Sequence, residues 1–253
     1  MTFWRESFIV FRRQLRMNIR NPAWVFIGAL QPVLYLVLFG PLLKPIVASF
    51  PNAPDNEYTF LVPGLLVQLG LFGAFFAGFS LIGEWREGVV EAERVTPASR
   101  TALLVGRLMR DVLQLFVQAL ILVGLGYALG MRGSVAGVAL GILLTLLIGG
   151  ACAAASNALA LTTKSEDVMA PVINMVMMPV LLLSGILLPM TLGAAWLQRT
   201  SDFMPFRWIV DGVRDSFVGD FGTSAMLWGV IWAAGLFALA LWWGTSTFRK
   251  ENA

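Results

Sequence analysis

The stretch FLVPGLLVQLGLFGAFFAGFSLIG, residues 60–83, contains no charged side chain. A helix needs about 20 consecutive apolar residues to cross the hydrocarbon core of a bilayer, so this stretch predicts a membrane-spanning helix. Outward from it, further charge-free runs of that size cover residues 21–43, 112–131, 133–163, 168–198 and 221–248. The sequence therefore predicts six spans.

The composition of the whole chain supports a membrane location. Hydrophobic residues make up 58% of its 253 positions, and charged residues only 13%. Soluble globular proteins carry roughly 25% charged residues, so the apolar surplus must face lipid. We predict an all-α integral membrane protein with one transmembrane domain over residues 1–253.

The run 168–198 is longer than one span needs, and it contains Ser184, Gly185 and Pro189. Non-helical backbone at membrane depth survives only where protein or a wet cavity satisfies its polar groups. We therefore expect a fifth span over about 168–184. A broken, re-entrant segment follows it.

The N-terminal segment 1–20 has the pattern of an amphipathic helix. Its apolar residues recur at helical spacing, and its arginines occupy the other faces, which is typical of a helix lying on an anionic membrane surface. A helix packed on a partner protein is the alternative. Charge persists to Arg20, so we do not expect a cleaved signal peptide. The apolar face comprises Trp4, Phe8, Phe11, Leu15 and Ile19.

Basic residues predict the orientation, because they are retained on the cytoplasmic side. Of the 18 Lys and Arg residues, all but five fall in the N-terminal segment, the 84–111 loop, the 164–167 loop and the tail. We therefore expect both termini in the cytoplasm. The remaining five are Lys44, Arg132, Arg199, Arg207 and Arg214.

The residue inventory argues against catalysis and against ion-coupled transport. The chain has no histidine, so imidazole bases and His-ligated metals are excluded. Cys152 is the only cysteine, and a packing role is expected for it. The charge-free runs also lack the ionisable residues that proton relays use. We expect no catalytic residue and no metal site.

ATP must be bound elsewhere if it drives this protein. A P-loop requires Gly followed by Lys and then Ser or Thr, whereas the three lysines follow Leu43, Thr163 and Arg249. An ATP-driven function therefore requires a separate ATPase subunit. A passive channel or a structural membrane protein without an ATPase is the alternative class.

Between the second and third runs lies a concentrated charged stretch, EWREGVVEAERVTPASR, residues 84–100. Gly88 and Pro97 favour a short helix over about 86–95 followed by a turn. On such a helix Glu87 and Glu91 are one turn apart and repel each other. Glu84 and Glu87 have no basic residue three or four positions further on, which suggests a partner offering Arg or Lys. A solvated loop is the alternative.

This stretch resembles the cytoplasmic loop of ABC-2 type transporter permeases. The similarity continues in LVPGLLVQ (61–68), TALLVGRLMRDVLQLFVQALIL (101–122), LSGILLP (183–189) and PFRWIVDGVRDSFVG (205–219), and it is greatest to daunorubicin/doxorubicin-resistance permeases. The chain departs from the family at Ala92 and Glu93, where the family often has leucine. The matching loop residues are Glu84, Arg86, Gly88, Glu91, Thr96, Pro97, Ser99, Arg100, Gly106 and Arg107.

The resemblance implies an ABC-2, type V exporter-like architecture in the bacterial cytoplasmic membrane. Two permease copies, identical or paralogous, would work with two ATPase chains, which bind ATP and Mg; no cofactor is expected in this chain. The substrate would be an amphiphilic drug, a lipid or a lipid-linked glycan, and no nucleic acid is expected as a partner. The loop would form a coupling helix in a cleft of the ATPase. Its coupling residues would be Glu84, Arg86, Glu87, Gly88, Glu91, Arg94, Thr96, Pro97 and Arg100.

Two further groups of residues are candidates for the transport path and the outer gate. Neutral polar and methionine side chains in the spans suit an adaptable apolar ligand site, although interhelical packing is an alternative for each. By resemblance, residues 185–220 form short re-entrant helices that close the outer side, with an interfacial loop as the alternative. The path candidates are Gln68, Asn174, Met175 and Met178, and the gate candidates are Ser184, Gly185, Pro189, Pro205, Asp211 and Arg214.

Overall fold

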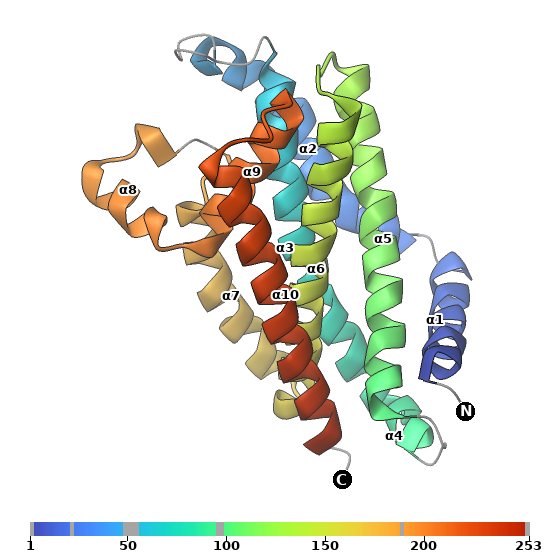
Figure 1. Cartoon of the computed structure of the whole chain (residues 1–253). Helices are drawn as coiled ribbons and strands as arrows, with labels where there is room; N and C mark the ends of the chain where they lie inside the picture. Colours follow the sequence, from blue (N-terminus) through green and yellow to red (C-terminus); the bar gives the residue numbers. More distant parts are fainter. Residues whose placement is uncertain (1–2, 21–22, 48–55, 95–98, 188–189, 251–253) are drawn as a thin grey trace.

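A computed structural model describes residues 3–20, 23–47, 56–94, 99–187 and 190–250, and its regular elements there are all helices (Figure 1). Between the fifth and sixth long helices lie a 3-10 turn and two shorter helices. The elements are α1 (Phe3–Arg20), α2 (Ala23–Val47), α3 (Glu57–Arg86), α4 (Val89–Arg94), α5 (Arg100–Ala128), α6 (Val135–Thr163), α7 (Glu166–Leu183), η1 (Met190–Leu192), α8 (Ala195–Asp202), α9 (Pro205–Val218) and α10 (Ser224–Lys250).

The prediction of six spans is confirmed. Within the described residues, α2, α3, α5, α6, α7 and α10 are each long and apolar enough to cross a membrane. α3 and α5 are longer than the charge-free runs that predicted them. α3 has 30 residues, which is about 45 Å at 1.5 Å per residue, whereas the hydrocarbon core is only about 30 Å thick.

Because α3 and α5 extend beyond these runs, each carries ionisable residues that were predicted to lie outside the spans. α5 begins at Arg100 rather than near 112, so Arg107, Arg110 and Asp111 lie within it. Glu84 lies within α3. The runs themselves contain no charged residue, and these ionisable residues lie where the helices continue beyond them.

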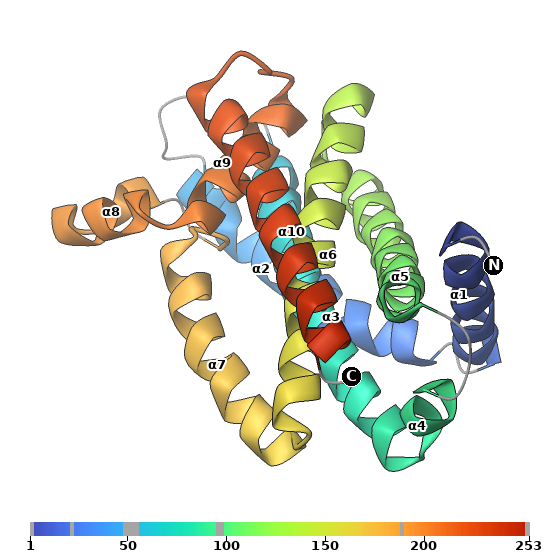
Figure 2. The ribbon, with the colours of Figure 1, turned by 60° about the horizontal axis from the view of Figure 1, so that its bottom comes forward.

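α3 and α6 form the centre of the bundle. They pack along each other, and their facing side chains, such as Leu65, Leu144 and Ile148, are almost completely buried. α10, α5 and α2 surround this pair, and α9 is inserted against α3, α6 and α10 (Figure 2). Of the short helices after the fifth span, α9 therefore packs into the bundle.

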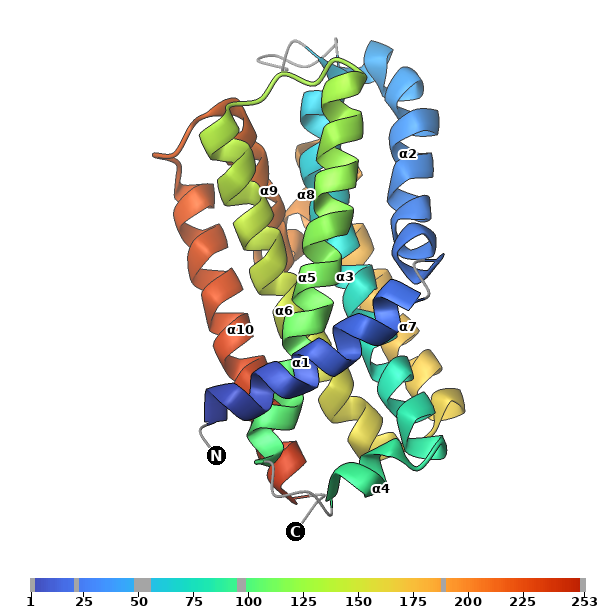
Figure 3. The same ribbon diagram turned by 90° about the vertical axis from the view of Figure 1, so that its right-hand side faces the viewer.

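The two ends of the bundle differ in what they carry. Both termini and α4 lie at one end, and α1 crosses the outside of α5 near that end (Figure 3). α8 projects sideways from the other half of the molecule (Figures 1 and 2). The described residues of the charged stretch, 84–94 and 99–100, are thus found at the end that carries both termini.

Candidate coupling site

The charged stretch forms the end of α3, a tight joint and the short helix α4 (Figure 3). The backbone N–H of Glu87 donates to the carbonyl of Gly83 at 3.1 Å and so caps α3. Gly88 follows with a φ of +74°, a left-handed conformation that costs glycine little. One helix over 86–95 was expected; the structure instead places Glu87 and Glu91 on opposite sides of a helix break.

A buried ion cluster holds this joint against α5. Arg107 Nη2 lies 2.8 Å from Glu84 Oε2 and 2.8 Å from Glu93 Oε2, with only 3% of the arginine side chain exposed. From α1, Arg13 Nη1 lies 3.0 Å from Glu93 Oε1, and Gln14 Nε2 donates to Glu84 Oε1 at 2.8 Å. We call Arg13, Gln14, Glu84, Glu93 and Arg107 the joint cluster.

A second arginine extends the joint cluster along α5. Arg110 Nη1 donates to Gln14 Oε1 at 3.1 Å, and its Nη2 lies 2.6 Å from Asp111 Oδ1. Buried charges persist only when they are paired and hydrogen-bonded. Because these partners come from α1, α3, α4 and α5, the joint cluster favours movement of the four elements as one unit.

α1 turns its polar face toward the protein. Glu6, Val10 and Gln14 are buried, whereas Trp4 and Phe8 from the apolar face are largely exposed. The predicted amphipathic helix therefore forms, with its apolar face free for lipid. Its polar face contacts α5, which the sequence did not reveal.

Close contact between α1 and α5 requires a glycine. A Cβ atom at Gly106 would lie 2.7 Å from the carbonyl oxygen of Ser7, closer than such atoms approach. The carboxylate of Glu6 accepts a hydrogen bond from the backbone N–H of Ser99 at 2.8 Å, and this bond lowers the pKa of Glu6. Ser99 is also the N-cap of α5, so α1 fixes the residue at which α5 begins.

Several predicted coupling residues have a different environment from the one expected. Glu84 has no basic residue three or four positions further on, and it pairs instead with Arg107 of α5, 23 positions away. Arg107 and Arg110 were expected in the loop and instead lie within α5. Sequence reasoning missed Gln14 as a partner because it lies 70 positions from Glu84. The available signal was the spacing of Arg107, Arg110 and Gln114, which places three polar side chains on one helical face and indicates a polar contact there.

The remaining acids of the charged stretch face outward. Glu87 and Glu91 are exposed, and no ion pair joins them to another described side chain. Arg86 is also exposed and pairs at 3.0 Å with Glu166 at the start of α7. The outer surface of the joint is therefore acidic and available for contact.

Other predicted coupling residues flank this surface. Gly88 forms the joint itself, Arg94 ends α4 and Arg100 begins α5. Thr96 and Pro97 lie outside the described residues.

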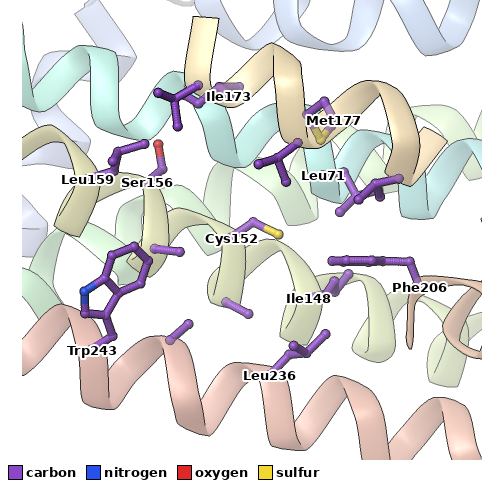
Figure 4. A pocket seen from close by; sticks show the side chains of 16 residues that line it. Leu71, Ile148, Cys152, Ser156, Leu159, Ile173, Met177, Phe206, Leu236 and Trp243 are labelled. Carbon is purple, nitrogen blue, oxygen red and sulfur yellow. The ribbon is translucent and has the colours of Figure 1, made fainter. Parts of the chain in front are cut away.

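An apolar cavity of about 320 Å³ lies between α6, α7 and α10 (Figure 4). Met177 lines it, but Met175 and Met178 do not; they are exposed on the outer side of α7, as is Asn174. Gln68 is buried within the bundle, and its side-chain oxygen has no described hydrogen-bond partner. The structure therefore does not bring the four path candidates together around this cavity.

Arg214 connects several of the gate candidates. From α9, its Nη2 donates to the carbonyl oxygens of Gly185 at 2.7 Å and Ile186 at 3.0 Å, just after α7. Its guanidinium carbon lies 4.3 Å from the centre of the Phe60 ring in α3. Arg214 Nη1 lies 3.5 Å from Asp211 Oδ1 within α9. α9 is thereby tied to the ends of α7 and α3.

The other gate candidates surround this contact. Burial raises the pKa of the Asp211 carboxyl, against the opposing effect of Arg214 and Arg207. Ser184 caps the end of α7, and Pro205 is the first residue of α9. Pro189 lies outside the described residues.

Known proteins resemble this chain over most of its length. The sequence model of the family described as "ABC-2 type transporter" matches residues 5–218. The protein named "Putative transport permease ycf38" from Cyanophora paradoxa is 28% identical over 217 residues, which cover 84% of this chain and 74% of that protein. Its namesake from Porphyra purpurea is 28% identical over 204 residues, covering 77% of this chain and 68% of that protein.

Proposed function

Because this chain belongs to the ABC-2 type transporter family and is a permease subunit of such a transporter, we propose that it exports an amphiphilic drug, lipid or related hydrophobic compound across the cytoplasmic membrane. Permeases of this family pair with ABC ATPase subunits. The proposed complex has two permease copies and two ATPase chains, which bind ATP and Mg. Both termini and α4 face the cytoplasm in this arrangement.

The joint cluster is the observation that carries the proposal. An ATPase pressing on α4 meets an acidic outer surface formed by Glu87 and Glu91, both exposed. Behind that surface, Glu84, Glu93 and Arg107 form buried ion pairs between α3, α4 and α5. A force applied to α4 is therefore transmitted to two spans instead of being absorbed by a flexible loop.

ATP binding can drive transport only if the ATPase contacts the permease differently in two states. The paired α3 and α5 ends provide a rigid element for such a change. The middle parts of the spans are uncharged, and their charged residues lie toward the helix ends. This composition supports the export of apolar or amphiphilic compounds. The substrate class is a proposal, and lipid-linked sugars belong among the compounds tested.

The experiment is ATP hydrolysis by the reconstituted permease–ATPase complex, measured across a panel of amphiphiles and lipid-linked sugars. We expect stimulation by at least one amphiphile. The double reversal Glu87→Lys and Glu91→Lys should reduce ATPase co-purification and abolish the stimulation, because it replaces an acidic docking surface with a basic one. Membrane insertion should be unchanged.

The matched control is Asp220→Lys, an exposed acid after α9 near the opposite end. It should co-purify with the ATPase as the unmodified chain does. Normal co-purification and stimulation in the double variant would show that the ATPase docks elsewhere. A panel in which no amphiphilic compound alters hydrolysis would reject the proposed substrate class.

A further inference from the structure

The residues that line the cavity between α6, α7 and α10 lie in rows along these helices (Figure 4), and we call this cavity the slot. Its lining residues recur every three or four positions along all three helices, so each helix contributes a continuous stripe. Along α6 the stripe runs from Ile148 to Leu159, which is roughly 16 Å at 1.5 Å per residue. The stripes comprise Ile148, Cys152, Ala155 and Leu159 from α6, Val172, Val176 and Val180 from α7, and Leu236, Ala240 and Trp243 from α10.

The chemistry of the slot excludes polar ligands from its interior. Of the described residues that line it, only Ser156 has a hydroxyl or charged group. The Ser156 Oγ already accepts a hydrogen bond from the backbone N–H of Gly78 at 3.2 Å. Apolar cavities without polar partners do not hold water, so the favourable occupant is hydrocarbon.

The two ends of the slot differ. Phe206 from α9 lies at one end beside Ile148, and Trp243 lies at the other with Leu159 (Figure 4). The indole nitrogen of Trp243 points away from the middle of the slot (Figure 4). Tryptophan commonly sits at the membrane interface, with its ring in the apolar region and its N–H toward headgroups. Trp243 lies near the C-terminal end of α10, on the side of the molecule that carries both termini.

We propose that this slot binds one alkyl chain of an amphiphile, which enters from the leaflet on the side of the termini. The alkyl chain lies along α6 with its end at Phe206, and the headgroup of the amphiphile lies beyond Trp243. An extended alkyl chain that lies along α6 contacts all three stripes. The volume of about 320 Å³ is within the range of small-molecule sites, about 300–1,000 Å³. Any role in loading the substrate rests on the proposed export function; the chain site itself does not.

The test is photo-crosslinking of the full-length chain in phosphatidylethanolamine–phosphatidylglycerol vesicles. The probe is a phospholipid with a diazirine in one acyl chain, and labelled residues are located by mass spectrometry. We expect label on Cys152 and on the buried lining residues Ile173 and Met177. The variant Ala155→Trp should remove that label, because the indole occupies the slot.

A second filling variant and a matched control separate occupancy from folding. Ala240→Phe fills the slot from α10 and should cause the same loss. Leu182→Trp places an equally large side chain on α7 at a position that is exposed and outside the slot. It should retain the label on the lining residues. Label on the lipid-facing residues of α2 should be equal in all four proteins.

Competition distinguishes the two sources of the chain. If excess lysophosphatidylcholine removes the label from the slot alone, the site accepts single-chain amphiphiles, as a substrate site must. If the label persists, the chain belongs to a resident membrane lipid, and the alkyl-chain site still stands. Absence of label from the slot while outer α7 residues react would overturn the proposal and indicate that a second copy of the chain fills it. None of these labelling outcomes depends on an ATPase. The alkyl-chain site can therefore be confirmed or overturned independently of the proposed export function.

Discussion

Two arginines near the end of the bundle carry the same charge in opposite surroundings. The side chain of Arg107 is 3% exposed and contacts two carboxylates, whereas the side chain of Arg86 is 58% exposed and pairs with one. Water screens the exposed pair, which limits an exposed ion pair to about 0–1 kcal/mol. Removing one partner of a buried pair is more costly, roughly 3–5 kcal/mol, because an uncompensated charge remains.

Replacing each arginine by methionine tests this difference. Arg107→Met leaves the Glu84 carboxylate without its cation, so we expect a loss of stability of roughly 3–5 kcal/mol. Arg86→Met should cost at most about 1 kcal/mol. The measurement is the fraction of monodisperse protein after heating in detergent, with denaturant titration for the free energy. Equal losses in the two variants would mean that Arg107 is not paired as described.

At the scale of elements, the packing of α1 on α5 depends on one missing side chain. A Cβ at Gly106 would lie 2.7 Å from the backbone oxygen of Ser7, whereas a Cβ at Gly124 of the same helix meets nothing within 4 Å. Alanine is a better helix former than glycine by about 1 kcal/mol. The same substitution therefore has opposite effects at the two positions.

We expect Gly106→Ala to displace α1 and to weaken the hydrogen bonds of Gln14 with Glu84 and Arg110. Gly124→Ala should leave α1 in place and stabilise α5 slightly. Amide hydrogen exchange of α1 in vesicles provides the measurement, with faster exchange expected in the first variant only. Unchanged exchange in Gly106→Ala would show that α1 does not rely on this close approach.

The elements also show how far sequence reasoning reaches. Runs without charge predicted six spans because lipid excludes charged residues from the hydrocarbon core. The same runs misplaced the start of α5 by about a dozen residues, because a helix continues past the hydrocarbon, where charge is tolerated. Glu87 and Glu91 are exposed, and the basic partner expected to contact the charged stretch stays a prediction. The pairing of Glu84 was not predictable, since Arg107 and Gln14 become neighbours only after α1, α3 and α5 pack together.

At the scale of the whole molecule, α3 connects two charged sites at its opposite ends. Glu84 near its last turn belongs to the joint cluster, and Phe60 near its first turn lies under the guanidinium of Arg214. Arg214 also holds the chain after α7 through the carbonyls of Gly185 and Ile186. Movement of the α4 end can therefore reach α7 and α9 through a single continuous helix.

This arrangement predicts that docking and outer closure can be separated by mutation. Arg214→Ala removes both carbonyl contacts and the ring contact, so we expect amphiphile-stimulated ATP hydrolysis and transport to fall while ATPase co-purification stays normal. Arg214→Lys retains the positive charge but lacks the planar guanidinium, so it should show a smaller loss. A partial loss in this variant indicates that misfolding does not explain the effect of Arg214→Ala. Arg199→Ala removes an exposed charge from α8 and should change neither property. If co-purification fell together with transport in the Arg214 variants, the two ends would not be independent, and α3 could not be regarded as a link between separate docking and closing sites.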